Sequence, residues 1–191
     1  MLTFAGLWGV PYLVQVHGMT RSEAAGFTTA MLFGFAVGGP LLGALSDRLG
    51  RRKLPYLGAA LVHAAGWACF LLLPDISPAA RYLLFAVIGF FAGGLIIGFA
   101  FVREATHPGA AGTVAGVVNM AVLGFAAIQQ SAIGWILDRN WQGAMSEGAR
   151  LYDAAAYQAA FLWLGVSALG AVASVTLTRE TYGRLRFDAG R

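Results

Sequence analysis

Long apolar runs alternate with short polar stretches along the chain. A helix needs about 20 mostly apolar residues to cross roughly 30 Å of hydrocarbon. The runs that reach this length cover residues 24–45, 55–74, 80–102, 113–137 and 156–178. A further run, 1–16, is several residues too short, and we expect it to be a first span without its front. The pattern therefore predicts six membrane spans within 1–178, followed by a polar tail at 179–191.

Local signals mark where several of these spans begin. Thr20 and Glu23 have the spacing of a capping box, in which the two side chains satisfy free backbone N–H groups at a helix start. Pro55 suits the first turn of a helix, because a residue there needs no N–H donor. The longest polar connection, 138–155, separates the last two spans.

The composition fits a membrane protein better than a soluble one. Hydrophobic residues make up 58% of the chain and charged residues only 12%, whereas a soluble domain is usually about a quarter charged. A soluble helical bundle would need charged outer faces, but the span 80–102 has no charge between Arg81 and Val102. We therefore predict an all-α polytopic membrane protein embedded in a lipid bilayer.

The basic residues predict an orientation and exclude one class of partner. They lie at the ends of apolar runs and form no basic face interleaved with aromatics, so we expect no nucleic-acid partner. If the chain crosses the membrane six times, nine of the 13 Lys and Arg residues lie on one side of the membrane. The positive-inside rule indicates that this side is the cytoplasmic one. We expect a multi-pass protein of the inner (plasma) membrane with both termini in the cytoplasm.

The connection between the spans 24–45 and 55–74 carries five charges within seven residues, 47–53. Gly43 lies one turn before Asp47, and its missing side chain allows another helix to approach. Asp47 can accept hydrogen bonds from Arg48, from Arg51 or from free N–H groups at a neighbouring helix start. Gly50 permits a left-handed turn into the next span.

This connection resembles the signature loop of the major facilitator superfamily, G-x-x-x-D-R-x-G-R-R. The matching positions are Gly43, Asp47, Arg48, Gly50, Arg51 and Arg52. The resemblance implies one half of a twelve-helix transporter that moves a small-molecule substrate by alternating access, with this loop as a conformational latch. The alternative is a positive cluster that only anchors the loop in the cytoplasm, although an anchor would need neither the aspartate nor the glycines.

Two further stretches resemble the C-terminal half of such transporters. The segment 103–109 is similar to the loop before the eleventh helix of bacterial members, and 129–138 is similar to the outer end of that helix. We therefore interpret the spans as helices seven to twelve, with an N-terminal half as the alternative. A six-helix half forms only one wall of a transport site. Transport therefore requires the complementary six-helix half or a second copy of this chain as a partner.

Glycines four residues apart occur in two of the spans. Gly34, Gly38 and Gly43 belong to such pairs in 24–45, and Gly89 and Gly93 in 80–102. Small residues at this spacing form a strip on which helix backbones approach closely. The strips favour either static close packing or sliding between helices.

Polar residues within the spans are candidates for a substrate cavity, because they are unfavourable in lipid. By the resemblance, the candidates are Trp8, Tyr12, Asn119 and Gln130. The alternative for each is an interhelical hydrogen bond, which contributes about 0.6 kcal/mol on average. We expect His63 to be a packed, hydrogen-bonded histidine rather than a proton relay.

The sequence favours a transporter over an enzyme. Three scattered histidines and one cysteine form no metal-ligand set, and no nucleophile motif occurs, so we expect neither enzymatic activity nor a metal or other cofactor. No carboxylate lies deep within a span, so the sequence does not decide whether transport is coupled to protons. It does not indicate the substrate either. The alternative function is a non-transporting remnant or interaction module from a split or truncated transporter gene.

Overall fold

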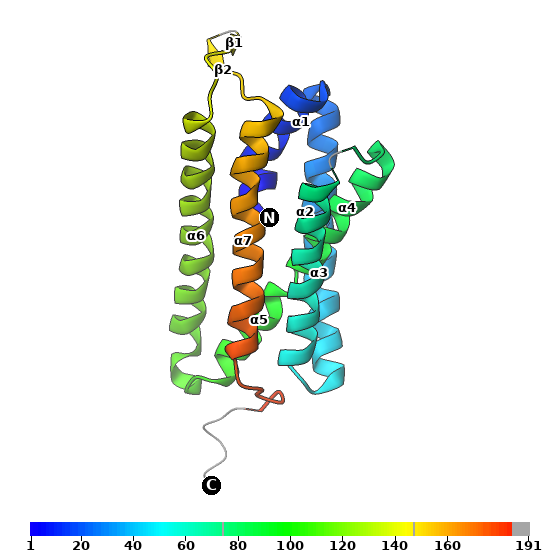
Figure 1. Cartoon of the computed structure of the whole chain (residues 1–191). Coiled ribbons are helices and arrows are strands. Elements are labelled where there is room, and N and C mark those ends of the chain that lie inside the picture. Colours follow the sequence, from blue (N-terminus) through cyan, green and yellow to red (C-terminus); the bar gives the residue numbers. More distant parts are fainter. Residues whose placement is uncertain (74, 147, 185–191) are drawn as a thin grey trace.

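The computed structural model describes residues 1–73, 75–146 and 148–184; residues 185–191 of the expected tail lie outside these ranges. Within them, five helical spans are long and apolar enough to cross a membrane. These spans are α2 (Arg21–Leu49), α3 (Lys53–Leu72), α4 (Pro78–Ala92) with α5 (Leu95–Glu104), α6 (Ala111–Arg139) and α7 (Ala154–Leu177). They form one bundle, which confirms the prediction of an all-α polytopic membrane protein (Figure 1).

The remaining elements are short. The chain starts with a π-helix, η1 (Phe4–Trp8), that continues into α1 (Gly9–His17). A 3-10 turn, η2 (Pro108–Ala110), precedes α6. The long polar connection between α6 and α7 contains a small antiparallel hairpin, β1 (Met145–Ser146) and β2 (Ala149–Arg150).

The predicted capping box begins α2. The Thr20 backbone N–H donates to the Glu23 carboxylate at 2.8 Å, and the Glu23 N–H donates to the Thr20 hydroxyl at 3.3 Å. Two N–H groups at the start of the helix are thereby satisfied without any partner from the rest of the fold. This prediction is confirmed.

The predicted span over 80–102 lies within one helical segment long and apolar enough to cross a membrane, Pro78–Glu104, but this segment is interrupted. Helix α4 ends at Ala92 and α5 begins at Leu95, with Gly93 and Gly94 in a turn between them. A Cβ at Gly93 would clash with the backbone of Gly39 in α2, and one at Gly94 would lie 2.8 Å from the Ala59 methyl group in α3. The glycine pair therefore lets the chain bend where it touches both neighbours. The apolar pattern runs on through the break, so it gave no sign of the bend.

The predicted glycine strips of α2 and α4 face each other. A Cβ at Gly34 would collide with the carbonyl oxygen of Ala86, and one at Gly38 with that of Phe90. In the opposite direction, a Cβ at Gly89 would collide with the carbonyl oxygen of Met31. The two backbones are therefore in direct contact, which only glycine permits at these positions.

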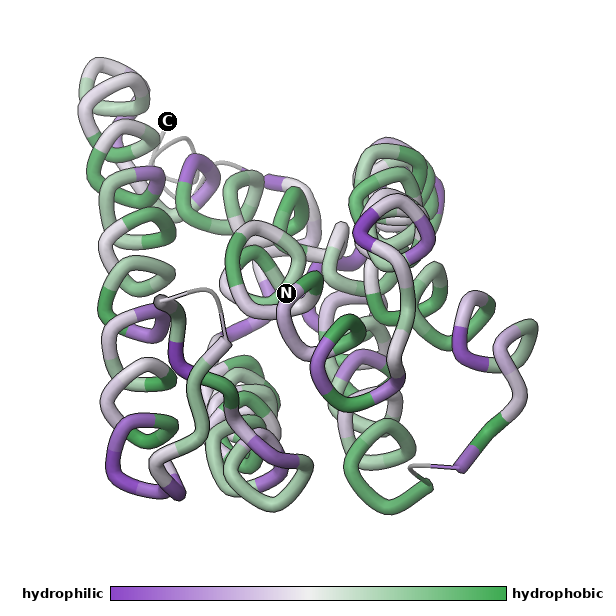
Figure 2. The backbone as a smooth tube through the Cα atoms, turned by 90° about the horizontal axis from the view of Figure 1, so that it is seen from above, coloured by the Kyte–Doolittle hydropathy of each residue, from purple (hydrophilic) through white to green (hydrophobic). Residues whose placement is uncertain are grey.

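Phe4, in the first segment, packs inside the bundle. The Phe4 ring is fully buried, with its centroid 5.2 Å from the rings of Phe85 and Phe161 and 5.5 Å from those of Trp67 and Phe70. Edge-to-face contacts of this kind favour a fixed arrangement of rings. Figure 2 shows this segment surrounded by the other helices.

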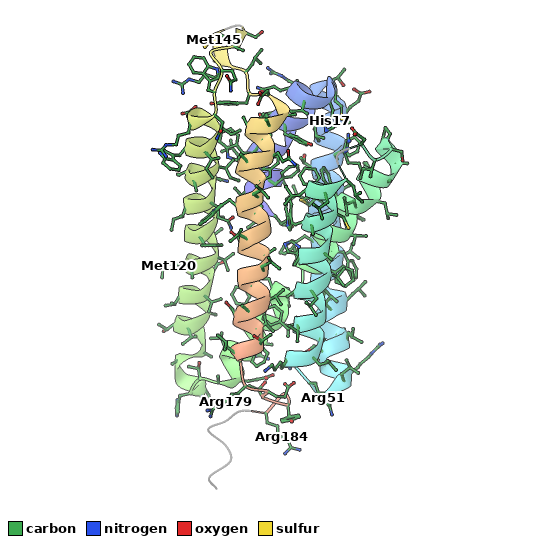
Figure 3. The ribbon with its side chains drawn as sticks, viewed as in Figure 1. His17, Arg51, Met120, Met145, Arg179 and Arg184 are labelled. Atoms are coloured by element: carbon green, nitrogen blue, oxygen red, sulfur yellow. The ribbon has the colours of Figure 1, made fainter. Side chains whose placement is uncertain are left out.

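Many large apolar side chains on the helices are exposed, and much of the helical backbone in Figure 2 carries the colour of hydrophobic residues. Helix α6 is the extreme case, because none of the residues in its most apolar stretch is buried. Val117, Met120, Leu123 and Ile128 are all exposed there, and Met120 points away from the bundle in Figure 3. These faces suit contact with lipid or with another membrane protein.

Candidate functional site

The turn between α2 and α3 has the conformation that its glycine predicts. Gly50 ends α2 with φ of 59°, in the left-handed region, and its N–H donates to the Asp47 carbonyl at 3.1 Å. The Ser46 hydroxyl donates to the Arg51 carbonyl at 2.9 Å and closes the turn. Arg52 then stands immediately before α3.

The Arg52 side chain is the centre of a buried ion cluster. Its Nε and Nη2 both donate to Oε1 of Glu104, at 2.9 and 2.7 Å, and its Nη1 donates to the Ser46 hydroxyl at 3.0 Å. The same Nη1 is paired with Asp47. Arg52 and Glu104 are only 7% and 4% exposed, so solvent screens their attraction little. The arginine thus joins the end of α2 to the end of α5.

The segment after α7 completes this cluster. Glu180 accepts hydrogen bonds from the backbone N–H groups of Arg52 and Lys53, at 2.7 and 3.0 Å, and so caps the start of α3. The Thr181 hydroxyl donates to Oε2 of Glu104. We call Asp47, Arg52, Glu104, Glu180 and Thr181 the Arg52 cluster. It lies at the end of the bundle where Figure 3 labels Arg51, Arg179 and Arg184.

Lys53 adds a second connection between α3 and α7. Its ammonium group donates to the carbonyl oxygens of Thr176 and Thr178, at 2.7 and 2.8 Å. These carbonyls belong to the last turn of α7 and to the residue that caps it, where the helix dipole favours a cation. The cluster and Lys53 together hold the ends of α2, α3, α5 and α7.

The structure corrects two expectations about the loop. Asp47 pairs with Arg52 rather than with Arg48 or Arg51, both of which are exposed. A Cβ at Gly43 would lie 3.6 Å from Ile96, an ordinary contact, so no backbone approaches closely there. The close approach occurs five and nine residues earlier in α2, at Gly38 and Gly34.

Glu104, Glu180 and Thr181 were missed by the sequence reasoning. Glu104 follows the expected span 80–102 by two residues. Its position at the end of an apolar run, on the same side as the basic loop, is the signal that could have suggested a partner for Arg52. Nothing local pointed to Glu180, because 128 residues separate it from Arg52.

Glu180 makes the stability of this end dependent on pH. Partial burial by itself raises the pKa of Glu180, but hydrogen bonds from the backbone N–H groups of Arg52, Tyr182, Lys53 and Thr181 hold this pKa below its ordinary value. A carboxyl with a lowered folded-state pKa contributes stability in full above its unfolded-state pKa of about 4.3. That contribution is lost as the pH falls through the folded-state pKa.

We expect Glu180→Gln to lower the free energy of unfolding by about 1 kcal/mol at pH 7, the usual size of a helix cap. The difference from the unaltered chain should shrink below about pH 4, where Glu180 itself becomes protonated. Thermal unfolding in detergent across this range measures both effects. A difference that stays constant with pH would show that the charge of Glu180 has no role.

The candidate cavity residues are not brought together in one site. Tyr12 lies in the aromatic core with its hydroxyl 3.0 Å from His17, and Asn119 is exposed on α6. Trp8 does meet Gln130, but its indole N–H donates to the Gln130 backbone carbonyl at 3.2 Å, not to the side chain. Trp8 and Gln130 are thus joined by a hydrogen bond, but the Gln130 side chain takes no part in it.

The neighbouring residue, Gln129, lines a cavity of about 230 Å³. Its side chain is 8% exposed, and Oε1 has no hydrogen-bond partner among the described residues. The cavity, which we call the Gln129 cavity, lies between the first segment and the middle of the bundle. Its lining includes Thr3, Phe35, Tyr56, His63, Phe125 and Gln129.

His63 is a packed histidine, as expected. Its Nδ1 lies 2.9 Å from the Ile88 carbonyl oxygen, and the Trp67 indole N–H donates to its Nε2 at 3.1 Å. A carbonyl only accepts and an indole N–H only donates, so Nδ1 carries the proton and Nε2 accepts. Both ring nitrogens are therefore occupied, and the imidazole is neutral.

A family model described as Major Facilitator Superfamily matches residues 1–189. The chain belongs to the Major Facilitator Superfamily. It is thus a multi-pass membrane protein of a transporter family, and its turn between α2 and α3 carries the signature residues. Among curated proteins, it is 54% identical over 41 residues to the alpha-ketoglutarate permease of Escherichia coli (strain K12). That match covers 22% of this chain and only 10% of the permease.

Proposed function

We propose that this Major Facilitator Superfamily chain forms one six-helix wall of a secondary transporter that moves a small solute by alternating access. The Arg52 cluster is the observation that carries the proposal. In alternating access one six-helix wall moves largely as a rigid body against the other. The Arg52 cluster and Lys53 fasten the ends of α2, α3, α5 and α7 to one another, which is what a wall that moves as a unit requires.

Asp47 supports a role for the loop as a latch. Its side chain is 66% exposed although one oxygen is paired with Arg52. The exposed part of the carboxylate is free to accept hydrogen bonds from N–H groups at the start of a helix in the opposite wall. Gly43, Arg48, Gly50 and Arg51 complete this loop, which closes the cytoplasmic side in one conformation.

The complementary six-helix half is the partner that we propose for α6. Its exposed surface includes Gly112, Gly116 and Gly124, where an added Cβ would meet nothing within 4 Å. Small residues along an exposed helix permit close approach by another helix, and Asn119 adds a hydrogen-bonding side chain to the same helix. A second copy of the chain is the alternative occupant of this face.

The proposed orientation places the Arg52 cluster in the cytoplasm. Arg48, Arg51, Arg103 and Arg179 are all exposed at that end of the bundle. Positive residues next to membrane helices are retained on the cytoplasmic side. Both ends of the chain then face the cytoplasm from the inner membrane.

The mass of the native polypeptide and its uptake of solute test the proposal together. The protein is extracted from its own membrane, weighed, and reconstituted into proteoliposomes with labelled 2-oxoglutarate, chosen because of the permease match, and a panel of neutral solutes. We expect transport from a polypeptide of about twice this length or from a pair of halves, and Asp47→Asn to slow it. A strictly monomeric six-helix protein without uptake would contradict the proposal and favour a non-transporting interaction module.

A further inference from the structure

A second cavity, of about 360 Å³, lies between α1, α3 and α7 at the end of the bundle opposite the Arg52 cluster. Figure 3 labels His17, which lines this cavity, at one end of the bundle and Arg51 at the other. None of the lining residues belongs to the Arg52 cluster or to the Gln129 cavity. In the proposed orientation this end faces away from the cytoplasm. We call this space the Asp75 cavity, after the residue of the turn between α3 and α4 that lines it.

Three aromatic rings form one wall of the Asp75 cavity. The ring centroid of Tyr12 lies 5.6 Å from that of Phe70 and 5.2 Å from that of Phe161, and the two phenylalanine rings lie 5.9 Å apart. All three side chains are buried in the core of the bundle. The rings therefore hold one another in place, and they present an apolar surface whose faces attract a cation.

Asp75 is the charged side chain of this cavity, because no Glu, Lys or Arg of the described residues lines it. Its carboxylate is exposed, and it forms no side-chain hydrogen bond or ion pair with another described residue. A cation that enters the cavity therefore gains a counter-ion, whereas an anion is repelled.

His17 and Tyr12 neither occupy the carboxylate nor repel a cation. The Tyr12 hydroxyl lies 3.0 Å from Nε2 of His17, so these two groups satisfy each other. Burial lowers the pKa of His17, and the nearby charge of Arg81 lowers it further, against the opposite effect of Asp75. The lowered pKa keeps the imidazole neutral at pH 7. Arg81 itself does not line the cavity.

We propose that the Asp75 cavity binds a small soluble amine in its protonated form. The ammonium group pairs with the Asp75 carboxylate, and the carbon skeleton lies against the rings of Tyr12, Phe70 and Phe161. A metal ion fits this lining less well, because it requires several oxygen ligands, and the described residues hold no group of three or more His, Cys, Asp or Glu side chains that could bind one. The site is separate from the proposed transport function and goes beyond it.

Protection of a thiol in the cavity tests the proposal on the purified chain. Cys69, the chain's one cysteine, is replaced by alanine, and Gln158→Cys is introduced at an exposed position of α7 that lines the cavity. The thiol is labelled with the neutral reagent 2-hydroxyethyl methanethiosulfonate. Three probes of similar size and different charge compete with the label: 2-phenylethylammonium, 2-phenylethanol and phenylacetate. Ser146→Cys, in the exposed hairpin, is the control position.

We expect 2-phenylethylammonium to protect Gln158→Cys at a concentration about tenfold lower than 2-phenylethanol, through an exposed ion pair together with a cation–π contact. Phenylacetate should protect least. Asp75→Asn should reduce the preference for the ammonium to about threefold, because the contact with the rings remains. Equal protection by the ammonium and the alcohol would overturn the proposal, as would an unchanged preference in Asp75→Asn or equal protection of Ser146→Cys.

Vesicles without added amine distinguish a soluble amine from the ammonium of a lipid headgroup. Labelling of Gln158→Cys is compared in vesicles of phosphatidylglycerol and of phosphatidylethanolamine. We expect equal rates in both. Slower labelling in phosphatidylethanolamine that disappears in Asp75→Asn would overturn the assignment to a soluble amine and identify a lipid site. Neither experiment depends on uptake, so its failure is distinguishable from failure of the proposed transport function.

Discussion

Replacement of Gly38 by alanine is expected to destabilise the bundle by about 2–3 kcal/mol, the upper range for overpacking a tight interface. The added methyl group would overlap the carbonyl oxygen and the Cα of Phe90 in α4. These are backbone atoms, so no side-chain rotation can make room and the two helices must separate. Thermal unfolding in detergent and the yield of monodisperse protein measure the loss.

Gly26→Ala is the matched control on the same helix. A Cβ at Gly26 would meet nothing within 4 Å. Alanine is favoured over glycine in a helix interior by up to about 1 kcal/mol, so we expect this variant to be neutral or more stable. Equal effects of the two substitutions would mean that α2 and α4 do not touch through their backbones.

Replacement of Arg52 by methionine should destabilise the protein by about 3–5 kcal/mol, the usual result of removing one partner from a buried ion pair. Methionine keeps much of the length of the side chain but leaves the Glu104 carboxylate, 4% exposed, without its guanidinium. Arg51→Met, at the adjacent exposed position, should change stability by less than about 0.5 kcal/mol. Unfolding measurements on the two variants give the difference directly.

The double variant Arg52→Met with Glu104→Gln tests the mechanism of that loss. If the loss comes from an uncompensated carboxylate, removing its charge should recover much of the stability. A double variant no more stable than Arg52→Met would show that Arg52 acts through packing and its bond to Ser46 instead.

Gln129 and Gln130 show that a local sequence pattern does not determine which of two adjacent residues faces a cavity. Both are amides in the same apolar run, and the family resemblance indicated Gln130 as the cavity residue. The structure has Trp8 against the Gln130 backbone and Gln129 facing the cavity. Adjacent residues on a helix point about 100° apart, so the choice between them depends on where the neighbouring helices stand.

By itself, the sequence determined the class of protein, the five long membrane spans, the cap at Thr20, the left-handed turn at Gly50 and the glycine strips of α2 and α4. Each of these depends on composition or on residues within a few positions of one another, where backbone geometry and hydrophobicity act directly. The tertiary structure alone decided the pairing of Arg52 with Glu104, the cap by Glu180 and the bend at Gly93. These features join residues that lie 52, 128 and 54 positions apart. At such separations the packing of the helices decides which residues meet. The apolar periodicity of the sequence does not indicate that packing.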